Sequence, residues 1–367
     1  MRIGIWGFYR YGNYGDELMA VAIGKHLLAK GFKVGVYQLR GDLCRQNGFE
    51  QFNDERELCG WADALILGGG NLLAESKNWP IADYFSKLIS DFLDALSFTR
   101  KPLVIVSVGG DGQTSFQSLL LPVRELLRHG SLLGVSVRLK SDRELLSEIC
   151  PGNVECHPDI LFGVASRIGA LRPDAERRCV MGYHLSDSTF SHWRALGINA
   201  LWRSTSIGRR REVVAISGFP ESYGDYRPYG RNGNRALINN DPVDFTRSIM
   251  TMSHVVTHKL HVGLVAAVGG AKVLFVNAHP KVHAQMIAIG MEMGLFGDTW
   301  EQRFGCSRVA GLASGLRIAA MVRLRGAVAR PTLVARLARE SEQHMGFLAR
   351  CLDQVRGTSR TSTSNPA

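Results

Sequence analysis

The chain opens with RIGIW (2–6), GFYRYGNYGD (7–16), an apolar pattern of helical spacing (17–30) and FKVGVYQL (32–39). The first and last of these segments are short and apolar, as buried strands are, and the polar, Gly-rich segment between them is typical of a loop. A strand, a helix and a second strand in this order form a unit whose strands pair in parallel. The opening residues therefore predict an α/β fold.

The first helical pattern carries its own start and stop signals. Asp16 can accept hydrogen bonds from the first turn as an N-cap, and Gly31 can adopt the positive φ that follows a last turn. We therefore predict a helix from Glu17 to about Lys30, capped by Asp16.

The alternation of strand and helix continues over most of the chain. Further strands are predicted at 62–67, 103–108, 132–138, 179–183, 213–218, 254–258 and 272–277. Further helices are predicted at about 80–98, 116–129, 141–149, 188–195, 241–252, 260–269 and 280–290. Strands that are apolar throughout are typical of parallel sheets covered on both faces. The Gly-, Tyr- and Arg-rich segment 219–240 is predicted to be a loop of functional length.

An Arg- and Pro-containing stretch at 166–178 is poor in apolar residues and indicates a boundary between two domains. We predict an N-terminal domain over 1–168 and a C-terminal domain over 169–300. Basic helices follow over 301–356, and 357–367 is predicted to be a disordered tail.

The excess of positive over negative charge lies in one half of the chain. There are 44 Lys and Arg against 33 Asp and Glu, a net charge of +11. Residues 1–168 contain 18 basic and 19 acidic side chains (net −1), so the remaining 26 and 14 give residues 169–367 a net charge of +12. Such a half fits an anionic ligand, an anionic membrane surface or nucleic acid. No nucleic-acid-binding motif accompanies the charge, so nucleic acid is not expected as a partner.

Several classes of protein are excluded by composition. Apolar runs such as ADALILGGG (62–70) are far shorter than the ~20 residues of a membrane-spanning helix. The first residues lack the apolar stretch of a signal peptide, so a cytoplasmic location is expected. The seven cysteines include no CxxC pair, which indicates buried, reduced thiols rather than disulfides or a zinc finger.

Candidate functional residues follow the predicted strands, because ligands of doubly wound sheets bind at the carboxyl ends of the strands. Asn13, Gly15 and Asp16 follow the first strand. Backbone N–H groups there could bind an anion or sugar hydroxyls, and the Asp16 carboxylate could act as a base. Gly69, Gly70 and Asn71 follow a later strand, where glycine lets a ligand approach the backbone. A tight turn explains these glycines equally well.

Cationic candidates come mainly from the second half. Lys259 and His261 lie at a strand-to-helix junction in THKLH (257–261), and Lys281 follows the next strand. Such loops could bind a phosphate or carboxylate and supply a general acid. A zinc site is the competing interpretation, since histidines are frequent here, although no familiar ligand spacing completes it. In the first half, Arg138 follows the strand GVSV and is either a ligand contact or part of a surface ion pair.

Taken in order, these segments resemble polysaccharide pyruvyl transferases over about residues 1–290. The resemblance rests on GNYGDE (12–17), LILGGGNLL (65–73), the SVR…S segment (136–141), Pro158-Asp159 and SHVVTHKLHVGLVAAVGGAKVLFVNAHPK (253–281). It implies two Rossmann-like, doubly wound domains that face a cleft, an architecture similar to that of GT-B glycosyltransferases. The chain departs from the family pattern at Lys259-Leu260-His261, where the family usually has Arg-Leu-His.

The resemblance also implies a reaction, carried out in a bacterial cell. Phosphoenolpyruvate would donate its pyruvyl group to two hydroxyls of one sugar, forming a cyclic ketal and releasing phosphate. The acceptor would be a lipid-linked oligosaccharide or a polysaccharide precursor of an exopolysaccharide or cell wall. No metal or organic cofactor is implied.

The same resemblance implies roles for the candidates. His261 would be the general acid and Asp16 the base for the sugar hydroxyl. Lys259, Arg138 and Lys281 would bind the anionic donor. The acceptor would be placed by a further set: Asn13, Gly15, Gly69, Gly70 and Asn71.

Two alternative functions stay open. A GT-B glycosyltransferase that uses a nucleotide sugar would have the same architecture, with Asp241 or Asp244 as candidate ribose ligands. A non-enzymatic, glycan-binding member of the family is the other. The arginines of 301–356 likewise allow two interpretations. They could form an amphipathic surface for peripheral contact with the inner face of an anionic membrane, or the solvated side of helices packed on the domains.

Overall fold

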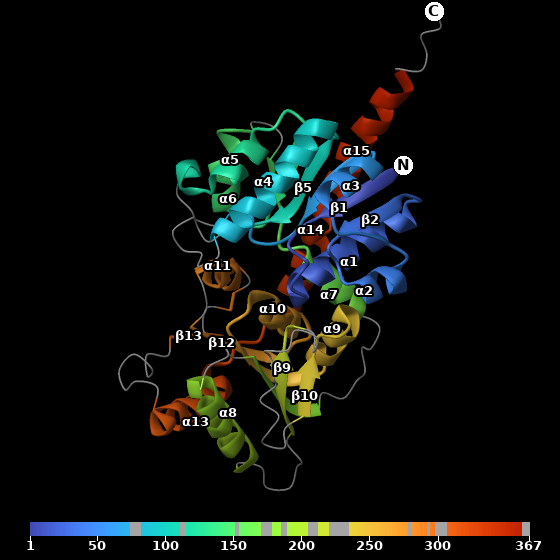
Figure 1. Ribbon diagram of the computed structural model, residues 1–367. Helices are drawn as coiled ribbons and strands as arrows, with labels where there is room; N and C mark the ends of the chain where they lie inside the picture. Colours follow the sequence, from blue (N-terminus) through green and yellow to red (C-terminus); the bar gives the residue numbers. More distant parts are fainter. Residues whose placement is uncertain are drawn as a thin grey trace, which may run out of the picture. The chain divides into compact units, whose positions relative to one another are not determined.

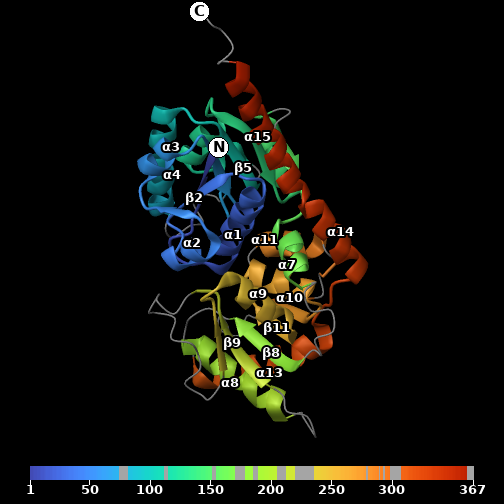
Figure 2. The same cartoon turned by 90° about the vertical axis from the view of Figure 1, so that its right-hand side faces the viewer.

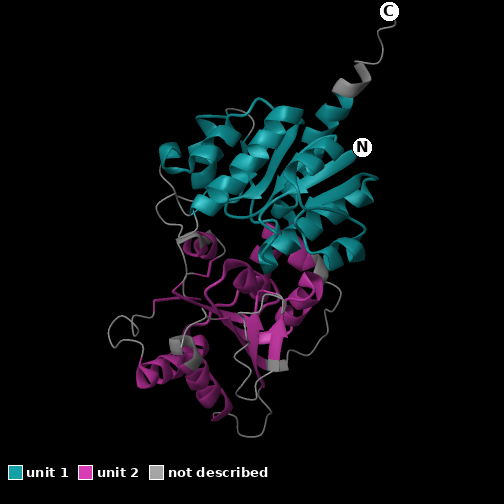
Figure 3. Ribbon diagram, in the orientation of Figure 1, with its two compact units in different colours: residues 1–160, 339–367 teal, residues 161–338 magenta. Residues whose placement is uncertain are grey.

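The computed structural model (Figure 1) describes the backbone of residues 1–73, 82–110, 115–150, 154–169, 178–184, 189–204, 212–219, 235–277, 280–288, 290–291, 294–297 and 307–361. It comprises two compact units, distinguished by colour in Figure 3. Unit 1 contains residues 1–160 and 339–367, and unit 2 contains residues 161–338. Each unit is built on one parallel sheet flanked by helices, which confirms the predicted fold class.

The described part of unit 1 contains a sheet with the strand order β3-β2-β1-β4-β5-β6-β7. The strands are β1 (Arg2–Trp6), β2 (Lys33–Tyr37), β3 (Glu50–Phe52), β4 (Ala64–Gly68), β5 (Leu103–Val108), β6 (Leu132–Val137) and β7 (Val154–Cys156). The helices are α1 (Tyr14–Ala29), α2 (Gly41–Asn47), α3 (Glu55–Trp61), α4 (Ala82–Thr99), α5 (Leu121–Leu127), α6 (Lys140–Ser147) and α15 (Gln343–Thr361), with a 3-10 turn at Phe116–Ser118. The strand order reverses between β1 and β4, so the loops after these two strands flank the switch point where such sheets bind ligands.

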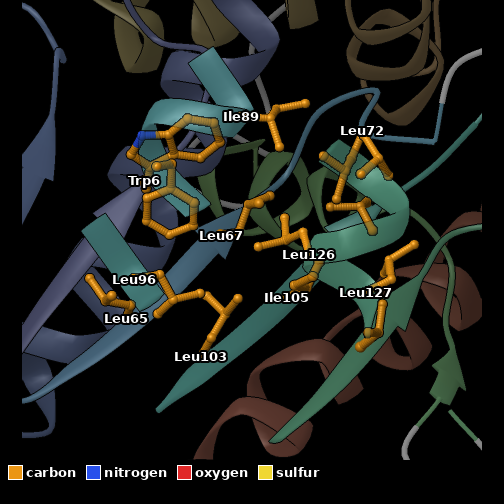
Figure 4. Close-up of a cluster of buried hydrophobic side chains, with 14 of the residues drawn as sticks. Trp6, Leu65, Leu67, Leu72, Ile89, Leu96, Leu103, Ile105, Leu126 and Leu127 are labelled. Carbon is orange, nitrogen blue, oxygen red and sulfur yellow. The ribbon is translucent and has the colours of Figure 1, made fainter. Parts of the chain in front are cut away.

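The core of unit 1 explains why its central strands are apolar throughout. Every residue of β4 and β5 is buried. On one face of the sheet, side chains of α3, α4 and α5 pack on those of the strands around Trp6, whose ring stacks on Phe92 at 4.5 Å (Figure 4). Figure 2 shows α15 on the face opposite α3 and α4. The strands are therefore covered on both faces, as their composition predicts.

The described part of unit 2 contains a sheet with the strand order β10-β9-β8-β11-β12-β13. The strands are β8 (Arg178–His184), β9 (Glu212–Ser217), β10 (Arg235–Ile238), β11 (Met252–Thr257), β12 (Lys272–Val276) and β13 (Leu295–Phe296). The helices are α7 (Leu161–Gly169), α8 (Thr189–Ser204), α9 (Pro242–Met250), α10 (Leu260–Val268), α11 (Pro280–Ala288), α13 (Arg308–Arg325) and α14 (Pro331–Ser341). Here the switch point lies between β8 and β11.

Several boundaries differ from the sequence prediction. The units divide after Ile160, because α7 packs against α10 of unit 2. The C-terminal helices belong to both units, since α13 packs on α8 of unit 2 whereas α15 packs on β5 and β6 of unit 1. Helix α15 extends into the predicted disordered tail as far as Thr361, and 362–367 lies outside the described residues. Of the predicted loop 219–240, residues 220–234 lie outside the described residues, and β10 lies within its last part.

A buried histidine fastens α15 to the sheet of unit 1. His344 Nε2 lies 3.1 Å from the carbonyl oxygen of Pro158, and Nδ1 lies 2.8 Å from the hydroxyl of Ser136. Because a carbonyl only accepts, Nε2 carries the proton and Nδ1 accepts from Ser136. Ser136 Oγ in turn accepts from the Ser107 N–H at 3.1 Å. Burial, aided by the charge of His157, lowers the pKa of His344 to about 3.

Because His344 is buried in its neutral form, we expect the free energy of unfolding to decrease in acid. Above about pH 6.5, the pKa of the imidazole in the unfolded chain, the ring is neutral in both the folded and the unfolded state. Between that pH and the lower pKa of the folded state, only the unfolded chain takes up a proton, and this stabilises the unfolded state. The free energy of unfolding should then fall by about 1.4 kcal/mol per pH unit for this group. Urea unfolding between about pH 7 and pH 4.5 measures the slope. His344→Gln cannot be protonated, so its slope should be shallower; a slope equal to that of the wild type would contradict the assignment.

Candidate functional site

The carboxyl edge of the unit 2 sheet brings cations to the amino end of α10. Thr257 ends β11, and its buried hydroxyl accepts from the Lys259 N–H at 3.0 Å. This turn places Lys259 at the N-cap of α10, with an exposed side chain, and His261 in the first turn, half-buried. The amino end of a helix is positive, so the turn combines an ammonium group with a helix dipole. Such an arrangement can bind an anion.

Two further histidines lie beneath this turn. The ring of His258 lies 5.1 Å from that of His184, the last residue of β8, and His258 Nδ1 donates to the His184 carbonyl at 3.2 Å. His184 Nε2 accepts from the Gly218 N–H at 3.3 Å, so the proton of the neutral ring is on Nδ1. Within the described residues His184 Nδ1 has no hydrogen-bond partner, although it is buried.

Both of these imidazoles are held neutral. Burial, together with the neighbouring His258 and Lys259, places the pKa of His184 well below its usual range. Burial and Lys259 also lower the pKa of His258 to about 4. The Lys259 charge is thus close to both rings, and at neutral pH the edge carries the ammonium without further buried charge. His184 was missed by the sequence analysis, because only the order of the strands places it beside His258.

Fewer of the candidate side chains after β12 lie within the described residues. Asn277 directly follows β12 with a φ of 48° and donates its N–H to the Phe296 carbonyl at 3.0 Å. Lys281 lies in α11, but its side chain and the whole of His279 are outside the described residues. His283 is exposed on the same helix. The predicted contact of Lys281 with the donor therefore stays a prediction.

At the edge of unit 1, the loops after β1 and β4 meet. Helix α1 begins at Tyr14 with Asn13 at the N-cap, so the prediction that Asp16 is the N-cap was wrong. The extra turn arises because the Asn13 carbonyl accepts from Glu17. Asp16 then lies in the first turn, half-buried, and its Oδ1 is 3.5 Å from where a Cβ on Gly70 would be.

The turn after β4 depends on its glycines. Gly69 and Gly70 have φ values of 73° and 92°, which L side chains rarely adopt. A Cβ on Gly69 would also lie 2.5 Å from Met19 Sδ. The glycines therefore form the turn, which faces the Asp16 carboxylate, and the ligand explanation stays a prediction. Gly15 is buried in α1, and Asn71 follows the turn.

A buried ion pair holds this turn in place. Arg138 Nη1 donates to Asp159 Oδ2 at 2.8 Å, and Arg138 Nη2 donates to the Gly70 carbonyl at 3.0 Å. The side chains are 4% and 0% exposed, so the alternative of a surface ion pair was wrong. The Gly109 N–H also donates to the Gly70 carbonyl, at 3.2 Å. Asp159 was missed as a functional residue, although Pro158-Asp159 stood out as a motif.

The neighbouring loop after β5 uses a second buried carboxylate. Asp142, which is 1% exposed on α6, accepts from the Gly110 N–H at 3.2 Å. Asp111 and Gly112 of the same loop lie outside the described residues. Asp142 therefore helps to hold the loop beside the Gly70 turn.

Other candidates have mainly structural contacts. Asp241 caps α9 by accepting from the N–H groups of Val243 and Asp244, and Asp244 pairs with Arg247 at 2.7 Å. Neither carboxylate is therefore a favoured ribose ligand. Among the described residues, no three His, Cys, Asp or Glu side chains are grouped so as to hold a metal ion. In the same part of the chain, no helix is both long and apolar enough to cross a membrane.

Comparison with known proteins gives a family and a fold. The family model of the polysaccharide pyruvyl transferases matches residues 13–280. No curated protein matches the chain in sequence.

The similar solved structures include two epimerases whose titles name UDP-GlcNAc and one glycosyltransferase. The UDP-GlcNAc 2-epimerase of Neisseria meningitidis, bound to UDP-GlcNAc, is 8% identical over 94% of this chain and 99% of that chain, with a TM-score of 0.53. The UDP-GlcNAc 2-epimerase of Methanocaldococcus jannaschii, in complex with UDP-GlcNAc and UDP, is 8% identical over 92% and 99%, with a TM-score of 0.54. The calicheamicin glycosyltransferase CalG4 is 12% identical over 100% and 99%, with a TM-score of 0.50. At these identities the similarity shows the GT-B-like fold alone.

Proposed function

Because the chain belongs to the polysaccharide pyruvyl transferase family, we propose that it transfers the pyruvyl group of phosphoenolpyruvate to two hydroxyls of one sugar, forming a cyclic ketal. The acceptor is a sugar of a lipid-linked oligosaccharide or polysaccharide precursor. The observation that carries the proposal is the anion-binding arrangement of Lys259 and His261 at the amino end of α10, beside the switch point of the unit 2 sheet.

The donor belongs at this edge because of its charge. Phosphoenolpyruvate carries two anionic groups, a phosphate and a carboxylate. In this proposal they bind to Lys259, the amino end of α10 and Lys281. The neutral states of His184 and His258 favour a single, localised ammonium charge at Lys259. Lysine binds an anion as a point charge and without the fixed fork of arginine.

The acceptor belongs at the edge of unit 1. Asp16 lies at the Gly70 turn, where a sugar hydroxyl can approach the backbone as well as the carboxylate. Asn13 and Gly15 lie at the start of α1 beside Asp16, Gly69 and Asn71 are the neighbours of Gly70, and these four residues would supply further hydrogen-bonding groups. The contacts of buried Arg138 with Asp159 and the Gly70 carbonyl support a role in positioning this turn, and its predicted contact with the donor stays a prediction.

In the proposed reaction, Asp16 and His261 transfer protons to and from the substrates. Asp16 takes the proton of the first hydroxyl, whose oxygen bonds to C2 of phosphoenolpyruvate, while His261 gives a proton to the methylene carbon. The proton on Asp16 returns to His261 through solvent before the next turnover. The methylene becomes a methyl group. The second hydroxyl then bonds to the same carbon, the carbon–oxygen bond to phosphate breaks, and the departing phosphate takes the second hydroxyl proton.

Turnover by Lys259 variants tests the proposal. Lys259→Ala should raise the KM for phosphoenolpyruvate about 10- to 100-fold, the effect of losing one charge-assisted hydrogen bond. Lys259→Arg should retain most of the affinity, since it keeps the charge. The assay incubates the protein with phosphoenolpyruvate and a panel of hexosides, and measures released phosphate and the mass of the sugar product.

Lys272→Ala is the matched control, because Lys272 begins β12 at the opposite edge of the same sheet. Its KM should equal that of the wild type. An unchanged KM in Lys259→Ala would show that the donor does not bind at this turn. A nucleotide sugar consumed in place of phosphoenolpyruvate would show that the reaction is glycosyl transfer.

A further inference from the structure

Helix α13 lies in a stretch of unbalanced charge. Between residues 307 and 339 the sequence contains seven arginines and no aspartate or glutamate: Arg308, Arg317, Arg323, Arg325, Arg330, Arg336 and Arg339. Most surface helices mix both signs, which limits the local potential. Within the described residues, Arg308, Arg317, Arg325 and Arg330 make no ion pair. The positive charges of these four arginines are therefore not neutralised by an ion pair with a described side chain.

The same helix is apolar on two sides. One side is buried against α8 and the unit 2 sheet and includes Ile318, Ala319 and Val322. Apolar side chains also face solvent: Val309 is 78% exposed, Leu324 is 79% exposed, and Leu312 and Leu316 are 38% exposed each. A helix that covers a core normally carries polar residues on its outer side. Helix α13, which lies beside α8 in Figure 1, exposes these apolar residues in addition to its arginines.

The exposed apolar residues continue past the end of the helix. Val328, in the segment between α13 and α14, is 48% exposed. Arg325 and Arg330 flank it and are both exposed. We use the name α13 face for the exposed apolar residues Val309, Leu312, Leu316, Leu324 and Val328 together with Arg325, which ends the helix, and Arg330, which follows it.

We propose that the α13 face docks on an anionic lipid bilayer surface. Charge complementarity carries the choice of partner, because a surface with unneutralised arginines and no carboxylates matches a layer of anionic headgroups. The apolar side chains beside the arginines can enter the region between headgroups and acyl chains. Arginine suits both zones, since its aliphatic stem packs on apolar groups while its guanidinium reaches a phosphate. Docking is independent of the chemistry at α10.

Vesicle flotation tests the proposal with the full chain. The protein should float with vesicles of phosphatidylcholine and phosphatidylglycerol, and much less with phosphatidylcholine alone. Each arginine near an anionic surface strengthens binding about fivefold, so Arg325→Glu/Arg330→Glu should weaken it at least tenfold. Leu324→Ser should weaken it as well, and added salt should release the protein. Unchanged thermal unfolding shows that these exposed substitutions leave the fold intact.

Two matched controls distinguish an effect of the α13 face from an effect of the protein's net charge or of losing any exposed apolar side chain. Arg45→Glu/Arg56→Glu makes the same charge change on exposed residues of unit 1 and should leave binding unchanged. Phe98→Ser removes a side chain more exposed than Leu324, from a helix that contains Asp91 and Asp94, and should also leave it unchanged. The proposal is overturned if the protein does not float with anionic vesicles, if vesicles without anionic lipid bind equally well, or if the controls weaken binding as much as the α13 variants.

Discussion

His261→Ala is expected to slow ketal formation by about 10²- to 10⁴-fold, the usual contribution of a general acid. His261 lies in the first turn of α10, half-buried, two residues after the N-cap Lys259. A donor held at the amino end of this helix would have its reacting carbon close to the imidazole. The loss should appear in kcat, while the KM for phosphoenolpyruvate changes little, because Lys259 still binds the anion.

His283→Ala is the control for this experiment. His283 is exposed on α11 of the same unit and is not assigned a role. Its kcat should stay within about twofold of the wild-type value, well below the effect of a general acid. If His261→Ala retained full kcat, or if His283→Ala lost as much, the general acid would have to be sought elsewhere.

Asp159→Asn is expected to lower the free energy of unfolding by about 3–5 kcal/mol. The substitution leaves the Arg138 guanidinium buried without its carboxylate partner, and desolvation of that charge is then uncompensated. The same change loosens the contact between Arg138 and the Gly70 carbonyl, so the turn beside Asp16 should also lose its position. Urea unfolding measures the stability, and the rate of ketal formation measures the second effect.

The exposed pair between Arg2 and Asp63 provides the matched control. Its side chains are 44% and 40% exposed, so Asp63→Asn should cost only about 0–1 kcal/mol. The double substitution Arg138→Met/Asp159→Leu removes both buried charges and should recover part of the stability lost in Asp159→Asn, without restoring the turn. Equal costs for Asp159→Asn and Asp63→Asn would contradict the assigned burial of the pair.

Local patterns in the sequence were enough to predict the fold class. β4 and β5 are recognisable because each is a short, continuous apolar run, and both lie in a parallel sheet as expected. The placement of Asp16 and Gly70 at the same edge of the sheet follows from the parallel direction of their strands, whereas their contact depends on β1 lying beside β4, which local patterns do not give. Short elements such as β3 and α3 were not predicted, since a few residues give too little periodicity.

The partners of the candidate residues could not be predicted, because they lie far away in the sequence. Asp159 meets Arg138 across 21 residues, His184 meets His258 across 74, and His344 meets Ser136 across 208. Each partner is a single polar residue in a largely apolar segment, and only the strand order brings the pairs together. The start of α1 was placed too late for a different reason: Asn13 and Asp16 are both good N-cap residues, and the hydrogen bond from Glu17 to Asn13 decides between them.

Thermal unfolding with phosphoenolpyruvate tests the central claim, that the amino end of α10 binds this donor, most directly. At 100 times its dissociation constant, a ligand that binds only the folded state adds about 2.7 kcal/mol of stability. We predict a clear rise in the unfolding temperature with millimolar phosphoenolpyruvate, reduced in Lys259→Ala and absent with UDP-sugars. A rise with a UDP-sugar and none with phosphoenolpyruvate would contradict the claim.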